Sequence, residues 1–401
     1  MENIIVNNKI MIYKKRKTYF PFYRAWFDGR EIKAVSDVLK SGWLTMGPKT
    51  LEFERVIKNY TKAKSAVAVN SCTAGLHLSL VALGINEGDE VITTPFTFIS
   101  VANVIVHQKA KPVFVDIEKD TFNIDPRKIE EKITRKTKAI LITHYGGNSC
   151  EMDQIMAIAR KNRLMVIEDC AHAIGSFYKG KHVGTFGETG NFSFYVTKNI
   201  TTGEGGMVIS NKKNIAEKIR ILRLHGMDKD AWKRYKKQGD WYYTVIEPGY
   251  KYNLTDLQAA IGLEQFKKLS KFNNLRRQHA RYLIKGLQGL KEITLPQERS
   301  YAKSSWHLFP ILINKEYLRI NRNQFIKELA KWNIGTSVHF IPIHLQPFYQ
   351  KKYGYKKGDF PVTEYIYERI VSLPFYPKMK KEDLNYLIYA IKRICNKFKI
   401  K

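Results

Sequence analysis

The sequence predicts an α/β fold with one large, mostly parallel sheet of about seven strands and a smaller C-terminal α/β domain. Between Ser65 and Leu224, short β-rich runs alternate with stretches of helical periodicity, and helices that cross between strands make neighbouring strands parallel. The chain has 401 residues, 44% of them hydrophobic, which is enough for two domains. We expect a large domain over 1–266 and a smaller one over 267–401.

Seven runs rich in apolar residues predict the strands of the sheet. They lie at 65–69, 89–94, 111–117, 138–144, 164–169, 190–196 and 205–210. Helical periodicity precedes and separates them at 31–39, 76–83, 100–107, 126–133, 152–162 and 214–224. The last two strands leave no room for a crossover helix, so we expect them to be neighbours joined by a turn.

The rest of the chain predicts the smaller domain. Thr255 and Gln258 fit a capping box at a helix start, and a long basic helix follows from about Lys267. Further elements are expected as strands at 304–313 and 336–341 and as helices at 323–332, 364–372 and 381–397. Residues 227–249 are polar and aromatic without clean periodicity, so we expect a long functional loop there.

Composition limits the classes of function. No apolar run approaches the ~18 residues that span a bilayer, and the N-terminal segment is unlike a secretory signal, so we expect a cytoplasmic protein without membrane contact. The four cysteines show no paired spacing for zinc or a disulfide framework, and we expect them to be reduced. The net charge of +31 raises a nucleic-acid binder as a rival class. The basic residues are scattered, however, and a positive field also favours a substrate that carries a diphosphate, so we expect no nucleic-acid partner.

The segment 191–206 contains one lysine, Lys198, among small and hydroxylated residues, followed by a Gly-Glu-Gly-Gly turn. A lysine that holds an aldehyde cofactor as a Schiff base must be positioned and at least transiently neutral, and a packed, glycine-rich site supplies both conditions. Nearby hydroxyls such as that of Ser193 suit a phosphate. The alternative is an ordinary surface turn between two strands.

Three other predicted strand ends carry polar or aromatic residues. Asn70–His77 opens a helix with small residues, which suits a phosphate but also describes an ordinary cap. Phe98 follows the next strand and is either a core residue or a flat face for a ring. Asp169 ends a run of apolar residues, where a carboxylate is costly unless it meets a cation or caps a helix. His172 follows it at the expected helix start.

The lysine segment resembles the motif of the DegT/DnrJ/EryC1/StrS family of sugar aminotransferases, which depend on pyridoxal phosphate (PLP). The motif reads Ser-Phe, three residues, Lys and then Thr-x-Gly-Glu-Gly-Gly, and it matches Ser193 through Lys198 to Gly206. Val196 departs from the proline of many members. The resemblance extends from Gly42 to about Pro377 and implies the aspartate-aminotransferase-like fold (fold type I).

The resemblance also implies roles for the residues at each motif. Lys198 would be the catalytic lysine, Asp169 would face the pyridinium nitrogen, and Phe98 would stack on the cofactor ring. The remaining implied cofactor contacts are Cys72, Thr73, Ala74, His172, Ser193 and, across a homodimer interface with shared active sites, Asn253. The implied substrate contacts are Trp43, Leu44, Thr45, Met46, His339, Phe340 and His344. His339 and His344 have no carboxylate or cysteine beside them, so no metal is expected there.

The activity implied by the resemblance is transfer of an amino group from L-glutamate to a nucleotide-linked keto-sugar. The segments 41–48 and 338–349 look most like those of members that aminate C4 of a UDP-4-keto-6-deoxy-hexose. Relatives that aminate C3 or cyclitols, and a non-catalytic PLP-binding regulator, remain alternatives. Relatives that carry histidine in place of the lysine act as dehydratases, and the presence of Lys198 argues against that activity.

Overall fold

The main body of the protein is a seven-stranded sheet. The computed structural model describes residues 5–6, 9–10, 13–228 and 242–400, and its large sheet has the strand order β3-β11-β10-β7-β6-β4-β5. The strands are β3 (Ser65–Val69), β4 (Glu90–Thr93), β5 (Lys111–Phe114), β6 (Thr137–Thr143), β7 (Met165–Asp169), β10 (Thr189–Ser193) and β11 (Gly206–Ser210). All seven predicted strands are confirmed, although β5 and β10 each end three residues earlier than predicted.

The sheet is parallel except for one strand. β4, β5, β6, β7 and β10 pair in parallel, whereas β11 runs antiparallel to both β10 and β3. The expectation that the last two strands are neighbours is therefore confirmed. The turn that joins them, residues 194–205, carries Lys198.

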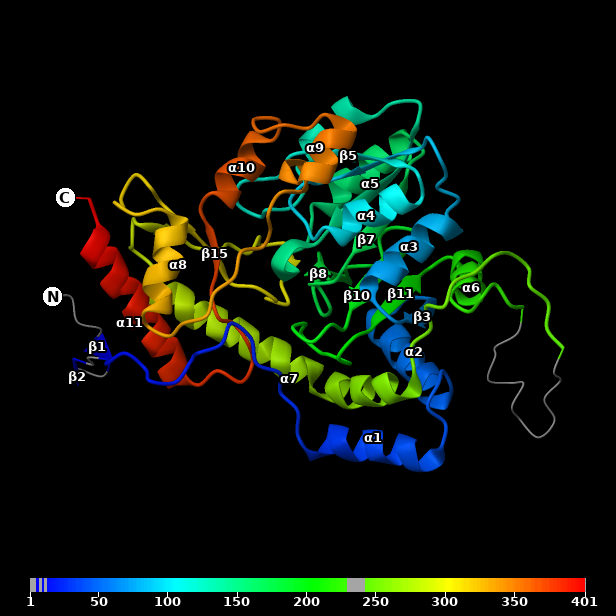
Figure 1. Cartoon of the computed structure of the whole chain (residues 1–401), viewed down its shortest axis with the longest axis horizontal. Coiled ribbons are helices and arrows are strands. Elements are labelled where there is room, and N and C mark those ends of the chain that lie inside the picture. Colours follow the sequence, from blue (N-terminus) through cyan, green and yellow to red (C-terminus); the bar gives the residue numbers. More distant parts are fainter. Residues whose placement is uncertain (1–4, 7–8, 11–12, 229–241, 401) are drawn as a thin grey trace.

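Helices cover both faces of the sheet (Figure 1). They are α1 (Gly29–Ser41), α2 (Pro48–Thr61), α3 (Cys72–Ala82), α4 (Ser100–His107), α5 (Met152–Lys161), α6 (Lys213–Leu222) and α7 (Asp256–Leu287). In β3, Ala66 and Ala68 pack with α2 and α7, while Val67 and Val69 pack with α3 and α6. This alternation is the period of two that a strand buried on both faces requires.

Helix ends follow local sequence. α1 begins at a capping box between Asp28 and Glu31 and ends at Gly42, whose φ of 72° is the left-handed conformation that glycine adopts readily. The capping box of Thr255 and Gln258 is present at the start of α7 and confirms that prediction. α7 then continues for 32 residues without a break through position 266. The division into domains 1–266 and 267–401 stays a prediction, and its boundary falls inside this helix.

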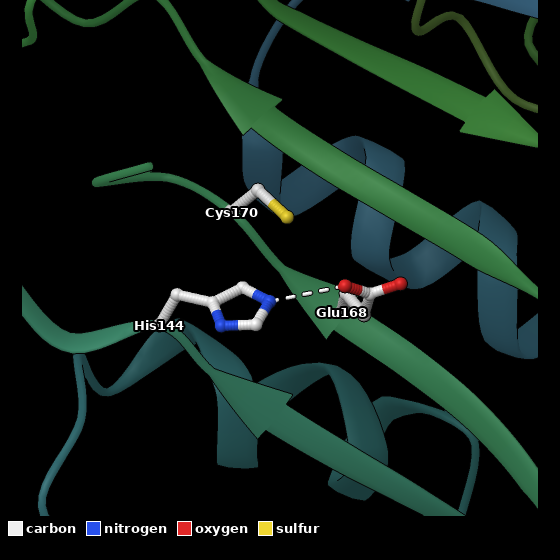
Figure 2. Close-up of side chains that lie close together, drawn as sticks. All are labelled: His144, Glu168 and Cys170. Carbon is white, nitrogen blue, oxygen red and sulfur yellow. Dashed lines mark hydrogen bonds and ion pairs between the residues drawn. The ribbon is translucent and has the colours of Figure 1, made fainter. Parts of the chain in front are cut away.

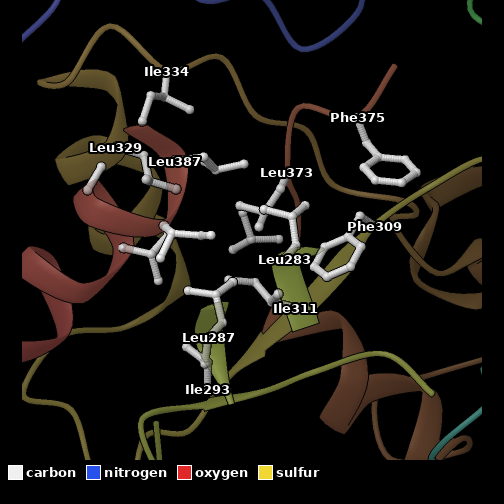
Figure 3. Packing of buried hydrophobic residues seen from close by; sticks show 14 of the residues in the cluster. Leu283, Leu287, Ile293, Phe309, Ile311, Leu329, Ile334, Leu373, Phe375 and Leu387 are labelled. Atoms are coloured by element: carbon white, nitrogen blue, oxygen red, sulfur yellow. The ribbon is translucent and has the colours of Figure 1, made fainter. Parts of the chain in front are cut away.

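The C-terminal part of the chain has its own core. Its elements are β12 (Ile293–Thr294), β14 (Pro310–Ile313), α8 (Arg322–Ala330), α9 (Pro347–Tyr353), α10 (Pro361–Tyr367), β15 (Ile370–Ser372) and α11 (Lys381–Phe398). Figure 3 shows the core, where Leu283 and Leu287 of α7 meet Ile311 of β14, Leu329 of α8 and Leu387 of α11. Each such buried side chain stabilises the fold by about 1.5–3 kcal/mol.

Small elements complete the fold. β1 (Ile5–Val6) pairs with β2 (Lys9–Ile10), and β8 (Phe177–Tyr178) lies between β9 (Lys181–His182) and β13 (Ala302–Lys303). Of the expected functional loop 227–249, residues 229–241 lie outside the described residues, as does the basic run 233–237. A search of the described helices finds none that is long and apolar enough to cross a bilayer.

Two predicted helices differ from the structure. Residues 126–133 form two 3₁₀ turns, η1 (Pro126–Lys128) and η2 (Glu130–Lys132), because the backbone bonds close over three residues from the Asp125 cap onward. The prediction over 364–372 is wrong in its second half. There, β-branched residues at 370 and 371 pair with β14 as strand β15.

Two predicted strands are shorter than expected or missing. Only Pro310–Ile313 of the run 304–313 joins a ladder. Trp306 has a φ of 47°, which is outside the strand region, and the carbonyls of Trp306 and His307 accept from Arg276 instead of from a neighbouring strand. Residues 336–341 form no strand, and Ser337 makes a single bridge to Ser372. The Tyr145 hydroxyl takes the His339 carbonyl, so this segment turns away from a ladder.

Candidate functional site

A cavity of about 470 Å³ opens at the carboxyl ends of the central strands. In parallel sheets this edge is where ligands bind. The lining residues come from the ends of β3, β6, β7 and β10, from the segment between β4 and α4, from the turn after β10 and from the C-terminal part of the chain. They are Ser71, Cys72, Thr73, Leu76, Thr97, Phe98, Ser100, Thr143, Asp169, Ala171, His172, Ser193, Tyr195, Thr197, Lys198, Glu204, Gly205, His307, His339 and Phe340.

One end of the cavity is the start of helix α3. The Ser71 side chain accepts a hydrogen bond from the Ala74 backbone N–H at 3.1 Å, which caps the helix and leaves the N–H groups of Cys72 and Thr73 without intrahelical partners. β11 passes so close that a Cβ on Gly206 would lie 2.5 Å from the Ser71 carbonyl carbon. This open helix start suits a phosphate.

Lys198 stands on the turn between β10 and β11. Desolvation lowers the pKa of its amine to about 8, although the negative charge of Asp169 works against that shift. At neutral pH a useful fraction of the amine is therefore uncharged, as a nucleophile or a base requires.

Asp169 is the buried carboxylate at the end of β7. Its Oδ1 accepts the Ala171 N–H at 2.9 Å, and its Oδ2 accepts the Thr143 hydroxyl at 3.2 Å. Burial raises the pKa of Asp169, and the positive charge of Lys198 opposes that rise. A cation placed against this carboxylate would offset the cost of its burial.

Rings form another wall of the cavity. His172 lies 4.5 Å from His307 and stacks on Phe340 at 5.9 Å, between ring centroids. Phe98 is 54% exposed, although it lines the cavity, and its ring lies 6.0 Å from that of Phe340. Burial holds the pKa of both His172 and His307 well below the ordinary value, so this wall is uncharged.

Three potential metal ligands lie close together: His144, Glu168 and Cys170 (Figure 2). Hydrogen bonds already occupy two of them. His144 Nδ1 accepts the Cys150 N–H, so its Nε2 donates to Glu168 at 3.0 Å, and Glu168 also accepts three backbone N–H groups from the turn 184–187. Burial raises the pKa of the Cys170 thiol far above its usual value. The cluster anchors this turn, and we propose no metal there.

The structure brings together most of the residues singled out from the sequence. Nine of them line the cavity: Cys72, Thr73, Phe98, Asp169, His172, Ser193, Lys198, His339 and Phe340. Ala74 follows Thr73 in the chain but is not among the lining residues, and its backbone N–H donates to the Ser71 side chain.

Other sequence candidates lie away from this cavity. Met46 is buried with Leu224 and Met227, while Trp43, Leu44 and Thr45 lie at the turn before α2. Asn253 makes a bridge to Val69 at the end of β3. His344 is fully buried and paired with Glu364 at 3.0 Å. The four cysteines are buried and free.

Sequence reasoning missed several residues of the cavity, among them Thr97, Thr143, Tyr195 and His307. Thr97 and Thr143 lie at or just after the end of a predicted strand. Polar residues at the carboxyl ends of parallel strands are expected at a ligand site, and this argument, which located Asp169, applies to the two threonines as well. His307 lies in a run expected to be a strand, and no local pattern points to it.

The chain is similar over most of its length to known proteins. The family model described as "DegT/DnrJ/EryC1/StrS aminotransferase family" matches residues 27–392. The uncharacterized protein MJ1066 of Methanocaldococcus jannaschii is 57% identical over 379 residues, which cover 94% of this chain and 98% of that protein. The spore coat polysaccharide biosynthesis protein SpsC of Bacillus subtilis is 46% identical over 382 residues, covering 95% and 98%.

Solved structures show the same likeness. The putative sugar aminotransferase Spr1654 from Streptococcus pneumoniae, in its PMP-form, superposes with a TM-score of 0.89 at 34% identity and covers 94% of this chain and 99% of its own. The same protein is also known in a PLP-form. PLP is thus the cofactor, and the enzyme is a sugar transaminase. The chain belongs to the DegT/DnrJ/EryC1/StrS aminotransferase family.

Proposed function

We propose that the protein transfers an amino group from L-glutamate to C4 of a UDP-linked 4-keto-6-deoxy-hexose. The observation that carries the proposal is the position of Lys198 in one cavity with the buried Asp169 and the open start of α3. An amine, a carboxylate and an anion site around one space are what transamination with PLP needs.

The residues of the cavity fit that cofactor. The N–H groups of Cys72 and Thr73 and the hydroxyl of Ser193 would hold the phosphate, and Asp169 would face the ring nitrogen. When bound, PLP accepts the electrons that the amino donor releases and carries the amino group to the second substrate. Phe98 offers an exposed flat face to the ring.

Lys198 supplies the base in this reaction. Its lowered pKa leaves a neutral amine that takes the proton from the α-carbon of the donor and returns a proton in the second half of the reaction. Asp169 lines the same cavity, and its carboxylate attracts the positive charge of Lys198. The uncharged wall of His172 and His307 adds no positive charge that would compete with the ammonium form of Lys198.

The substrate is supported by weaker observations. SpsC is named for polysaccharide biosynthesis and Spr1654 as a sugar aminotransferase, which favours a sugar acceptor. The net charge of +31 favours a substrate with a diphosphate. The likeness of residues 41–48 and 338–349 to members that aminate C4 supports that carbon.

The first test is chemical. The purified protein loaded with PLP is mixed with L-glutamate, and 2-oxoglutarate is measured; a UDP-linked 4-keto-6-deoxy-hexose is then added, and the position of the new amine is read by NMR. The proposal expects amine at C4, whereas turnover only with a 3-keto isomer would contradict it. Lys198→Ala should lose at least ~10²-fold in rate, and Lys161→Ala, a surface lysine paired with Glu130, should not.

We also propose a homodimer in which Asn253 completes the partner's site. Asn253 is buried but lies outside this chain's own cavity, and a role across an interface accounts for that position. The test mixes two inactive proteins, Lys198→Ala and Asn253→Ala, after unfolding and refolding them together. Random pairing makes about half of the dimers mixed, and each mixed dimer has one site with both substitutions and one site with neither. About a quarter of the native activity should therefore return, and no recovery would contradict shared sites.

A further inference from the structure

His307 is held in one orientation by the backbone around it. Its N–H donates to the Gly146 carbonyl at 2.8 Å. Its own carbonyl accepts from the buried Arg276 guanidinium at 3.1 Å, and the same Arg276 nitrogen holds the carbonyls of Trp306 and Phe375. A buried cation that bonds three carbonyls fixes this segment firmly, because each contact would be costly to lose.

The side chain of His307 is fixed as well, through two asparagines. The Asn273 amide N–H donates to the Ile174 carbonyl at 3.0 Å, which leaves its Oδ1 as an acceptor. Asn199 donates to that Oδ1 at 2.8 Å and to the Ser305 carbonyl at 3.0 Å, so the Asn199 Oδ1 is also an acceptor. His307 Nδ1 lies 3.0 Å from it and must carry the proton. The chain of amides therefore leaves Nε2 of His307 without a proton.

The neighbouring His172 is fixed in the opposite tautomer. Its Nδ1 accepts the Gly146 N–H at 3.2 Å, so its Nε2 carries the proton. Two rings 4.5 Å apart thus offer one donor and one acceptor to the same cavity. In the described part of the chain, His307 Nε2 has no hydrogen-bond partner of its own.

We propose that His307 is a positioning residue of the reaction, whose bare Nε2 accepts a hydrogen bond from the Lys198 ammonium when Lys198 carries the proton taken from substrate. No proton passes to the imidazole ring. His307 orients the Lys198 ammonium after it has taken a proton from the substrate and before it returns one. This rests on the role proposed for Lys198 above.

The electrostatics suit an acceptor that stays neutral. The titratable and charged groups that face His307 are His172, Lys198, Arg276 and His339, and together with burial they keep the pKa of His307 well below its ordinary value. An imidazole whose pKa lies well below the ordinary value accepts a hydrogen bond at neutral pH without competing for the proton.

Two substitutions separate this role from simple packing. His307→Gln keeps an oxygen acceptor, and His307→Phe keeps the flat ring without one. We expect His307→Phe to lower kcat about 10- to 100-fold with little change in KM, and His307→Gln to recover about tenfold of that loss. A packing role predicts the reverse order, with Phe the milder change, and that order or a wild-type rate for Phe would overturn the proposal.

A pH profile supplies the second readout. The acceptor stabilises the ammonium form of Lys198, so its loss lowers the pKa of that amine, and the rising limb of the glutamate half-reaction should move to lower pH in His307→Phe. An unmoved limb would overturn the proposal. Thermal unfolding checks the fold of each variant, and His307→Leu replaces the Phe variant if that one is unstable. If Lys198→Ala keeps full activity, the proposed function itself fails; if Lys198→Ala is inactive and His307→Phe is normal, only this inference fails.

Discussion

The Thr143 hydroxyl donates a hydrogen bond to Oδ2 of Asp169 across 3.2 Å, and the Thr97 hydroxyl lies 2.8 Å from that of Thr143. Since the single proton of Thr143 goes to the carboxylate, Thr97 is the donor of the second bond. The ends of β6 and β7 and the segment after β4 are joined in this way at the wall of the cavity.

Thr143→Val removes the donor and keeps the shape. A hydrogen bond to the ionised form holds a pKa down, so its loss raises the pKa of Asp169 further and weakens its hold on a protonated ring nitrogen. We expect affinity for PLP to fall about tenfold, measured by titrating the protein and following its absorbance. Thr143→Ser retains the hydroxyl and should bind as the native protein does; equal binding by both variants would refute the prediction.

The reaction of the cofactor-free protein with PLP should depend on pH through Lys198. Burial disfavours the ammonium form and lowers its pKa to about 8, so the neutral amine grows tenfold per unit of pH below that value and levels off above it. Stopped-flow absorbance from pH 6 to 10 measures the rate. A rate that still rises tenfold per unit up to pH 10, as for an exposed lysine, would show that desolvation does not act on Lys198.

Gly206→Ala should damage the start of α3. The added Cβ would lie 2.5 Å from the Ser71 carbonyl carbon and 2.6 Å from the Cys72 nitrogen, both of them backbone atoms that cannot swing aside. We expect a loss of about 1–3 kcal/mol in unfolding free energy and weaker binding of PLP. Gly29→Ala, where a Cβ meets nothing within 4 Å, is the control for both measurements and should change neither.

His344→Gln distinguishes a substrate contact from a structural residue. His344 is sealed from solvent beside Glu364 and Phe360. We expect a loss of about 1–3 kcal/mol in stability and a KM for the keto-sugar within about twofold of the native value. His339→Gln, at the cavity wall, gives the comparison; a raised KM for the His344 variant alone would restore His344 as a substrate residue.

The sequence was most informative about functional side chains that lie at the ends of predicted strands. The seven strands could be predicted because each is a short apolar run, and Asp169 and Lys198 could be located because one ends a strand and the other stands in a distinctive turn. Thr143 obeys the same rule but was missed, since a threonine at a strand end is ordinary in itself.

Residues that act from a distance could not be predicted. His307 lies in a segment that leaves the expected strand, where its carbonyl accepts from Arg276, 31 residues earlier in the chain. The sequence does not distinguish His344 from the nearby His339. In the structure, residues 343–360 pack against β5 at the edge of the large sheet, whereas His339 lines the cavity. The positions of these two histidines depend on contacts between segments that are distant in the sequence, and the local hydrophobic pattern does not reveal such contacts.

Helix α7 fixes the distance and the rotation between Asp256 at its start and Arg276 further along. At its first residue, Asp256 accepts the backbone N–H groups of Gly47 and Thr50, and twenty residues later Arg276 holds the His307 segment. One residue inserted between them would rotate Arg276 by about 100° around the helix axis and withdraw it from its three carbonyls. Seven inserted residues would bring it back to nearly the same angle but about 10 Å too far along. The number of helical residues between Asp256 and Arg276 is therefore fixed by the contacts that the two side chains make.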